Sequence, residues 1–135
     1  MEHVLLLSDD IDQTCEFYCT VIGLRVGTRP PLEFPGYWLY ASDAACLHIA
    51  ERGAYRAHAA RIGLDVPDDP GGPGPVDHIA FAATDYDEAT ERLENSGVAA
   101  IRNTVPGGGP RQLFIEDPNG VRVEINVRQS PNQVR

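Results

Sequence analysis

Three histidines and one glutamate stand at corresponding places in two halves of this 135-residue sequence. His3 and His78 each follow an acidic residue and open an apolar run, while His48 and Glu124 come late in their halves. Imidazole and carboxylate groups of this kind suit Fe(II), Mn(II), Ni(II), Co(II) or Zn(II). Two histidines and one carboxylate on one side of a metal also leave positions open for substrate or dioxygen.

Each of these side chains also has an ordinary structural explanation. A single histidine on a half-exposed sheet is more often hydrogen-bonded to a neighbour than bound to a metal, and a glutamate there is more often solvated. The correspondence of four such residues favours the metal site over four independent coincidences. We therefore predict that His3, His48, His78 and Glu124 contribute to one site.

The elements that would position these residues follow from the apolar periodicity. The first half predicts a strand, a helix ending near a glycine, and three more strands, at residues 2–8, 11–22, 24–29, 37–41 and 45–51. The second half predicts the same order, at residues 76–84, 86–96, 98–105, 111–116 and 121–127. A repeated βαβββ unit indicates an α+β fold. If the first and last strands of each unit are neighbours, each half contributes one pair of candidate ligands.

The length of the chain suits one well-buried domain, internally duplicated. We expect a single domain over residues 1–135, with one module at about 2–51 and a second at about 76–128. Residues 52–75 form the predicted linker, which begins with a short helix at about residues 55–62. The prolines and glycines of residues 67–75 cannot support a regular element.

The charge of the chain excludes some classes of partner. A formal net charge of −9 repels nucleic acid and anionic membranes. No apolar run approaches the roughly 20 residues of a membrane span. The start of the sequence is acidic where a secretory signal would be basic, and the three cysteines lack a paired spacing. We expect a cytoplasmic protein that acts on a small molecule.

Two motifs, Asp77–Phe81 and Leu113–Glu124, carry a resemblance to a known family. Over residues 2–128 the sequence resembles the vicinal oxygen chelate superfamily, which includes glyoxalases, extradiol catechol dioxygenases, fosfomycin-modifying thiol transferases, methylmalonyl-CoA epimerases and bleomycin-binding proteins. The resemblance implies two βαβββ modules that form a cupped mixed sheet with helices outside, and a homodimer. It also implies a divalent metal held by His3, His78 and Glu124.

His48 falls at the variable fourth position of that family and is the candidate catalytic residue. Glyoxalases usually have a carboxylate or amide there, whereas His48 could be a fourth ligand or an acid–base group beside the metal. In extradiol dioxygenases a nearby histidine helps to move the catechol proton. This comparison favours an Fe(II) extradiol-type dioxygenase. The alternatives are a glyoxalase-type lyase or isomerase and, second, a metal-free drug-binding protein.

The resemblance also raises one difficulty for the dioxygenase. Those enzymes commonly have a tyrosine where this sequence has Phe114, so Tyr37 or Tyr40 would have to supply the hydroxyl. The predicted substrate is a small organic molecule that presents two adjacent oxygens to the metal.

Five further side chains are candidates for the substrate pocket. Aromatic residues on an inner sheet face can stack on a planar substrate, although ordinary packing is their commoner role. An arginine could pair with a substrate carboxylate or phenolate, although most arginines on strands are solvated. The predicted pocket residues are Trp38, Tyr40, Gln112, Phe114 and Arg122.

Overall fold

The chain forms two compact units in a computed structural model that describes residues 1–64, 66 and 76–128. Unit 1 comprises Met1–Pro70 and unit 2 comprises Gly71–Arg135. The proline- and glycine-rich part of the predicted linker, at residues 67–75, lies outside the described residues.

Unit 1 contains a four-stranded mixed sheet with the strand order β1-β4-β3-β2. Its strands are β1 (Val4–Ser8), β2 (Arg25–Gly27), β3 (Gly36–Ala41) and β4 (Ala44–Glu51). Its helices are α1 (Ile11–Phe17), the π-helix η1 (Tyr18–Ile22) and α2 (Arg52–Arg61). Strands β1 and β4 are parallel, and the other pairs are antiparallel.

Unit 2 repeats this arrangement with the strand order β5-β8-β7-β6. Its elements are β5 (Ile79–Ala83), α3 (Tyr86–Asn95), β6 (Ile101–Thr104), β7 (Arg111–Glu116) and β8 (Arg122–Val127). Strands β5 and β8 are parallel neighbours. In both units the first and last strands therefore lie side by side, and the predicted α+β fold with two βαβββ units is confirmed.

The first helix of each unit begins at an aspartate and is followed by a left-handed glycine. The Asp10 carboxylate accepts a hydrogen bond from the backbone N–H of Gln13, and Asp85 caps α3 in the same way. Gly23 and Gly97 have φ angles of 89° and 68°. The predicted continuous helix over residues 11–22 is α-helical only as far as Phe17, and its last turn is the π-helix.

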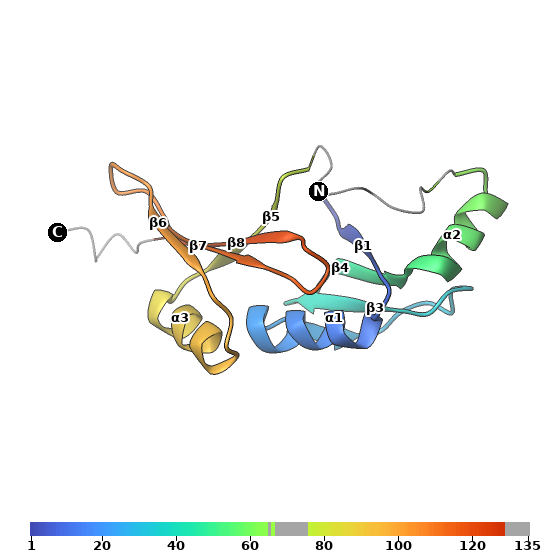
Figure 1. Ribbon diagram of the computed structural model, residues 1–135, viewed down its shortest axis with the longest axis horizontal. Helices are drawn as coiled ribbons and strands as arrows, with labels where there is room; N and C mark the ends of the chain where they lie inside the picture. The colour runs from blue at the N-terminus through green and yellow to red at the C-terminus, as the bar shows by residue number, and fades with distance from the viewer. Residues whose placement is uncertain (65, 67–75, 129–135) are drawn as a thin grey trace. The chain divides into compact units, whose positions relative to one another are not determined.

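Each sheet has one buried apolar face and one face that carries the candidate residues. In unit 1, α1 packs on β3 and β4, as Figure 1 illustrates. The buried residues Leu39, Leu47 and Ile49 lie on one face of these two strands. In unit 2 the buried face includes Leu113 and Val123. Because strand side chains alternate, the intervening residues point to the other face. No helix among the described residues is long and apolar enough to cross a membrane.

Candidate functional site

The four candidate ligands occupy equivalent places in the two sheets. His3 and His78 lie one residue before the first strand of their units, rather than inside it as predicted, because pairing with the neighbouring strand begins one residue later. The residue two places after each histidine pairs with the second candidate, His48 in unit 1 and Glu124 in unit 2. The sequence repeat therefore corresponds to the same register in both sheets.

His78 is held at both ring nitrogens. Its Nδ1 lies 2.8 Å from Asp77 Oδ2, and its Nε2 lies 2.8 Å from Glu124 Oε2. Arg122 Nη1 donates to both oxygens of Asp77 at 3.0 Å. The hydrogen bond from His78, followed by the one from Arg122, lowers the pKa of Asp77. Asp77 therefore fixes the orientation of the imidazole and leaves Nε2 directed at the glutamate.

Glu124 is buried, and its second carboxylate oxygen is also occupied. Only 7% of its side chain is exposed, compared with 37% of the His78 side chain. Gln112 Nε2 donates to Glu124 Oε1 at 2.7 Å, and Asn103 Nδ2 donates to the Gln112 amide oxygen at 2.7 Å. The Phe114 ring contacts His78 edge-on, with a centroid separation of 6.3 Å. Three strands thus position one carboxylate beside one imidazole.

In unit 1 the two candidate histidines form a stack with Trp38. The His48 ring lies between His3, at a centroid distance of 3.9 Å, and Trp38, at 4.1 Å. His3 Nδ1 lies 2.9 Å from Glu2 Oε1, which matches the contact of His78 with its preceding acid. Burial, followed by the neighbouring His3, lowers the pKa of His48. The neutral imidazole is therefore favoured at His48 in this stack.

A pocket of about 200 Å³ opens beside this stack. Its walls are mainly apolar and aromatic, and a single arginine, Arg29, is its one lining residue with a permanent charge. The lining residues are His3, Leu5, Arg29, Leu32, Phe34, Trp38, His48, Ile49 and Tyr55.

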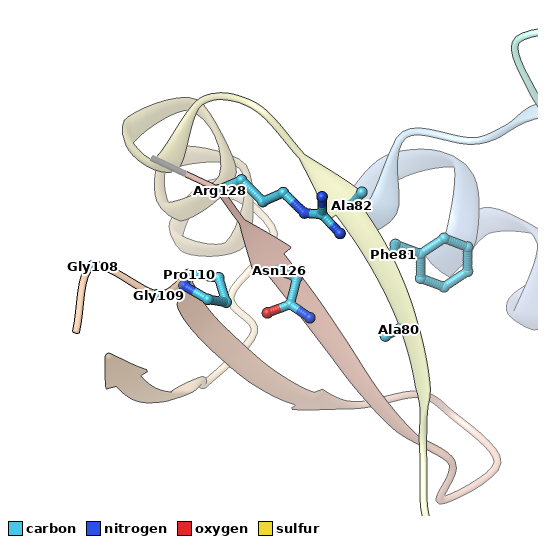
Figure 2. A pocket seen from close by; sticks show the side chains of 8 residues that line it. All are labelled: Ala80, Phe81, Ala82, Gly108, Gly109, Pro110, Asn126 and Arg128. Atoms are coloured by element: carbon cyan, nitrogen blue, oxygen red, sulfur yellow. The ribbon is translucent and has the colours of Figure 1, made fainter. Parts of the chain in front are cut away.

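Unit 2 has a larger hollow of about 530 Å³ on the same face as Glu124. Figure 2 shows the Asn126 amide and the extended Arg128 side chain at the end of β8, beside Ala82 of β5. The glycine-rich loop between β6 and β7 closes one side with Gly108, Gly109 and Pro110. Asn126 Oδ1 is buried and has no hydrogen-bond partner within the described chain.

The remaining predicted pocket residues have defined partners. Trp38 lines the unit 1 pocket, whereas the Tyr40 hydroxyl donates to the Thr28 carbonyl oxygen at 2.6 Å. Gln112 and Arg122 hold Glu124 and the acid beside His78, as described above.

Sequence reasoning missed three contributions to the two sites. Glu2 and Asp77 each precede a candidate histidine, and this repeated acid–histidine order was the available signal for their contact with Nδ1. Arg29 had no such signal, because the last residue of a predicted strand gives no indication of a pocket.

The donor chemistry of unit 2 fits a divalent metal. His78 Nε2 and Glu124 Oε2 face each other at 2.8 Å, and both are groups that bind metals in their deprotonated forms. Within each unit, as far as the chain is described, no group of three or more His, Cys, Asp or Glu side chains gathers into a metal site. The four predicted ligands are divided equally between the units.

Comparisons with known proteins agree with this architecture. The family model of the Glyoxalase/Bleomycin resistance protein/Dioxygenase superfamily matches residues 1–125. Glyoxylase I 4 of Arabidopsis thaliana is 27% identical over 128 residues, covering 93% of this chain and 68% of that protein. Lactoylglutathione lyase of Salmonella typhimurium is 26% identical over 132 residues, covering 91% and 88%.

A solved structure shares the fold. The glyoxylase/bleomycin resistance protein/dioxygenase domain from Frankia sp. EAN1pec has a TM-score of 0.69 and 19% sequence identity, covering 97% of this chain and 93% of that one. At this identity the likeness concerns the fold alone.

Proposed function

The chain belongs to the Glyoxalase/Bleomycin resistance protein/Dioxygenase superfamily, and from that premise we propose that it is a divalent-metal enzyme acting on adjacent oxygens of a small organic substrate. The observation that carries this proposal is the contact between His78 Nε2 and Glu124 Oε2. Both groups are oriented by further hydrogen bonds, as metal ligands usually are. A solvated glutamate on a half-exposed sheet would need neither burial nor this support.

The proposed ligands are His3, His78 and Glu124, with His48 as a fourth ligand or a proton-transfer group. A divalent metal bound by them would act as a Lewis acid toward the substrate oxygens. Asp77 keeps His78 Nε2 available by occupying Nδ1, and Glu2 does the same for His3. The stacked rings of His3 and Trp38 cover the faces of the His48 imidazole and not its edge, where the two ring nitrogens lie.

Of the two reactions considered, we place the glyoxalase-type lyase or isomerase first and the Fe(II) dioxygenase second. The sequence relatives described above carry glyoxylase and lactoylglutathione lyase names. The tyrosine hydroxyls that the dioxygenase would need are also engaged elsewhere. Tyr37 donates to Asp12 on the helix-covered face, and Tyr40 donates to the Thr28 carbonyl. Cytoplasmic location and homodimer formation stay predictions.

Metal analysis tests the proposal directly. Protein purified without chelator is expected to bind close to one divalent ion per chain, and His78→Ala and Glu124→Gln should lower that content strongly. His58→Ala is the matched control, because His58 is the remaining histidine and lies in α2. A metal content that is negligible in the unaltered protein would reject the enzyme and favour the drug-binding alternative.

Activity assays then separate the two reactions. With Ni(II), Zn(II), Co(II) or Mn(II), the lyase is expected to turn over a hemithioacetal formed from an α-oxoaldehyde and a thiol. With Fe(II) loaded anaerobically, the dioxygenase would consume oxygen when given a panel of catechols. Oxygen uptake without hemithioacetal turnover would reverse the order that we propose.

A further inference from the structure

We infer that Arg29 forms an anion subsite in the unit 1 pocket, and that the substrate therefore has a planar apolar part carrying a carboxylate. This inference rests on the proposed function, since it names the class of molecule that the site would take. Arg29 lies in the pocket that His3 and His48 also line. A carboxylate bound there would place the rest of the molecule next to two of the proposed ligands.

The Arg29 guanidinium lacks a carboxylate partner among the residues that the structure describes. Its Nη2 donates to the Phe34 carbonyl oxygen at 2.5 Å, and its charge lies over the Phe34 ring at 5.2 Å. Its Nε is buried and has no acceptor in the described chain. A buried donor without an acceptor costs free energy, so a ligand oxygen at this position would be favoured.

The acidic residue of the loop between β2 and β3, Glu33, is paired with other residues than Arg29. Glu33 lies 3.0 Å from Arg61 Nη2 and 3.5 Å from His58 Nδ1. Two groups of α2 thus hold this carboxylate. The charge of Arg29 remains available for a ligand, and a planar guanidinium is suited to bind a carboxylate through two parallel hydrogen bonds.

The walls of the pocket define the rest of the ligand. Leu5, Leu32, Trp38 and Tyr55 supply apolar and aromatic surface. A volume of about 200 Å³ is below the range of roughly 300–1,000 Å³ that holds whole drug-sized ligands, so the pocket suits one ring with its substituent. Aromatic walls favour a flat group, which can stack on them.

Trp38 makes this inference measurable, because it is the only tryptophan of the chain and lies in the pocket. Its fluorescence is followed in metal-free protein while benzoate is added, and the titration is repeated with benzamide, an uncharged molecule of nearly the same shape. Benzoate is expected to bind more tightly than benzamide. In Arg29→Met the benzoate affinity should fall about 10- to 100-fold, while that for benzamide stays nearly unchanged.

Arg25→Met is the matched control. Arg25 is exposed on β2, donates to the Ser42 carbonyl at 3.1 Å and does not line the pocket. Equal weakening in both variants, or equal affinity for benzoate and benzamide in the unaltered protein, would overturn the inference. Arg29→Lys keeps the charge but loses the planar fork, so an intermediate affinity is expected if Arg29→Met does not fold.

The same experiment distinguishes the inference from the function on which it rests. A preference for benzoate that depends on Arg29 in a protein that binds no metal would reject only the proposed enzyme. Metal binding that is intact without any anion preference would reject only the subsite.

Discussion

The acid that precedes His3 in unit 1 and His78 in unit 2 is the clearest residue-scale feature of the two units. Asp77 and Glu2 contact the Nδ1 atoms of His78 and His3 at 2.8 and 2.9 Å. A carboxylate at this nitrogen fixes the ring and raises the basicity of the other nitrogen. The acid–histidine pair that the two units share therefore has a structural role, because the acid orients the imidazole that follows it.

Replacing Asp77 with Asn should weaken metal binding without removing a ligand. Loss of an orienting partner typically lowers metal affinity about 10- to 100-fold, and a competition titration with a chelating dye would measure the change. Asp87→Asn, on the exposed side of the first turn of α3, is the control. An unchanged affinity in Asp77→Asn would mean that His78 is not a ligand or does not depend on its neighbour.

Cys15 should be the least reactive of the three free thiols near neutral pH. Burial, followed by the nearby Cys19, raises its pKa from 9.0 to about 11, whereas Cys19 and Cys46 are only half-buried. At pH 8 this shift reduces the thiolate fraction about 100-fold. Alkylation followed by mass spectrometry should therefore label Cys19 and Cys46 first.

The same shift has a consequence for stability, with a definite sign. The neutral thiol is favoured in the folded protein, so its contribution is complete below pH 9 and is lost as the pH rises through about 11. Chemical denaturation between pH 8 and 11 should show a decline that is smaller in Cys15→Ala.

At the scale of the elements, close approach between strands fixes the shape of unit 1. Gly36 pairs with Ala50 across β3 and β4, and a Cβ at Gly36 would overlap the carbonyl oxygen of Ile49. Gly53 of α2 has room for a Cβ, with its nearest neighbour at 3.4 Å. These two glycines therefore respond differently to the same change.

Gly36→Ala is expected to lower the free energy of unfolding by about 1–3 kcal/mol, because the strands must separate to admit the methyl group. Gly53→Ala should leave it unchanged or raise it by up to about 1 kcal/mol, because alanine is the better helix former. Urea denaturation would measure both. A similar loss in the two variants would contradict the close approach at Gly36.

The order of helices and strands along the chain could be predicted from the sequence, because periodicity and the repeat both depend on local patterns. The pairing of the first and last strands of each unit entered only as a condition, because it depends on contacts between distant residues. The residues that complete the site could not be predicted. Arg29 reaches the pocket only because the loop after β2 folds back through its contact with Phe34. The engagement of Tyr40 by Thr28 is likewise a matter of tertiary contact. Neither contact produces a periodic pattern in the sequence from which it could be predicted.

At the scale of the whole molecule, two units share one register and differ in side chains. His48 in unit 1 corresponds to Glu124 in unit 2, and Trp38 corresponds to Phe114. The first unit thus offers a stack of rings, and the second offers a hydrogen-bonded carboxylate. The two units therefore have the same strand order but carry different functional groups at equivalent positions.

The π-helix η1 coincides with a one-residue difference in length between the two units. Asp10 and Asp85 begin equivalent helices, but the left-handed glycine follows 13 positions later in unit 1, at Gly23, and 12 positions later in unit 2, at Gly97. A π-helical turn accommodates one additional residue without shifting the helix on either side of it.

Deleting Thr20, which is exposed within η1, should therefore restore an ordinary α-helix and leave the melting temperature nearly unchanged. Glu91 is exposed in the regular α-helix α3, which contains no π-helical turn. Deleting Glu91 should therefore rotate the buried Leu93 away from the core. The free energy of unfolding should then fall by nearly as much as when a buried leucine is removed, about 2–5 kcal/mol. Equal destabilisation by both deletions would mean that unit 1 needs the additional residue for its stability.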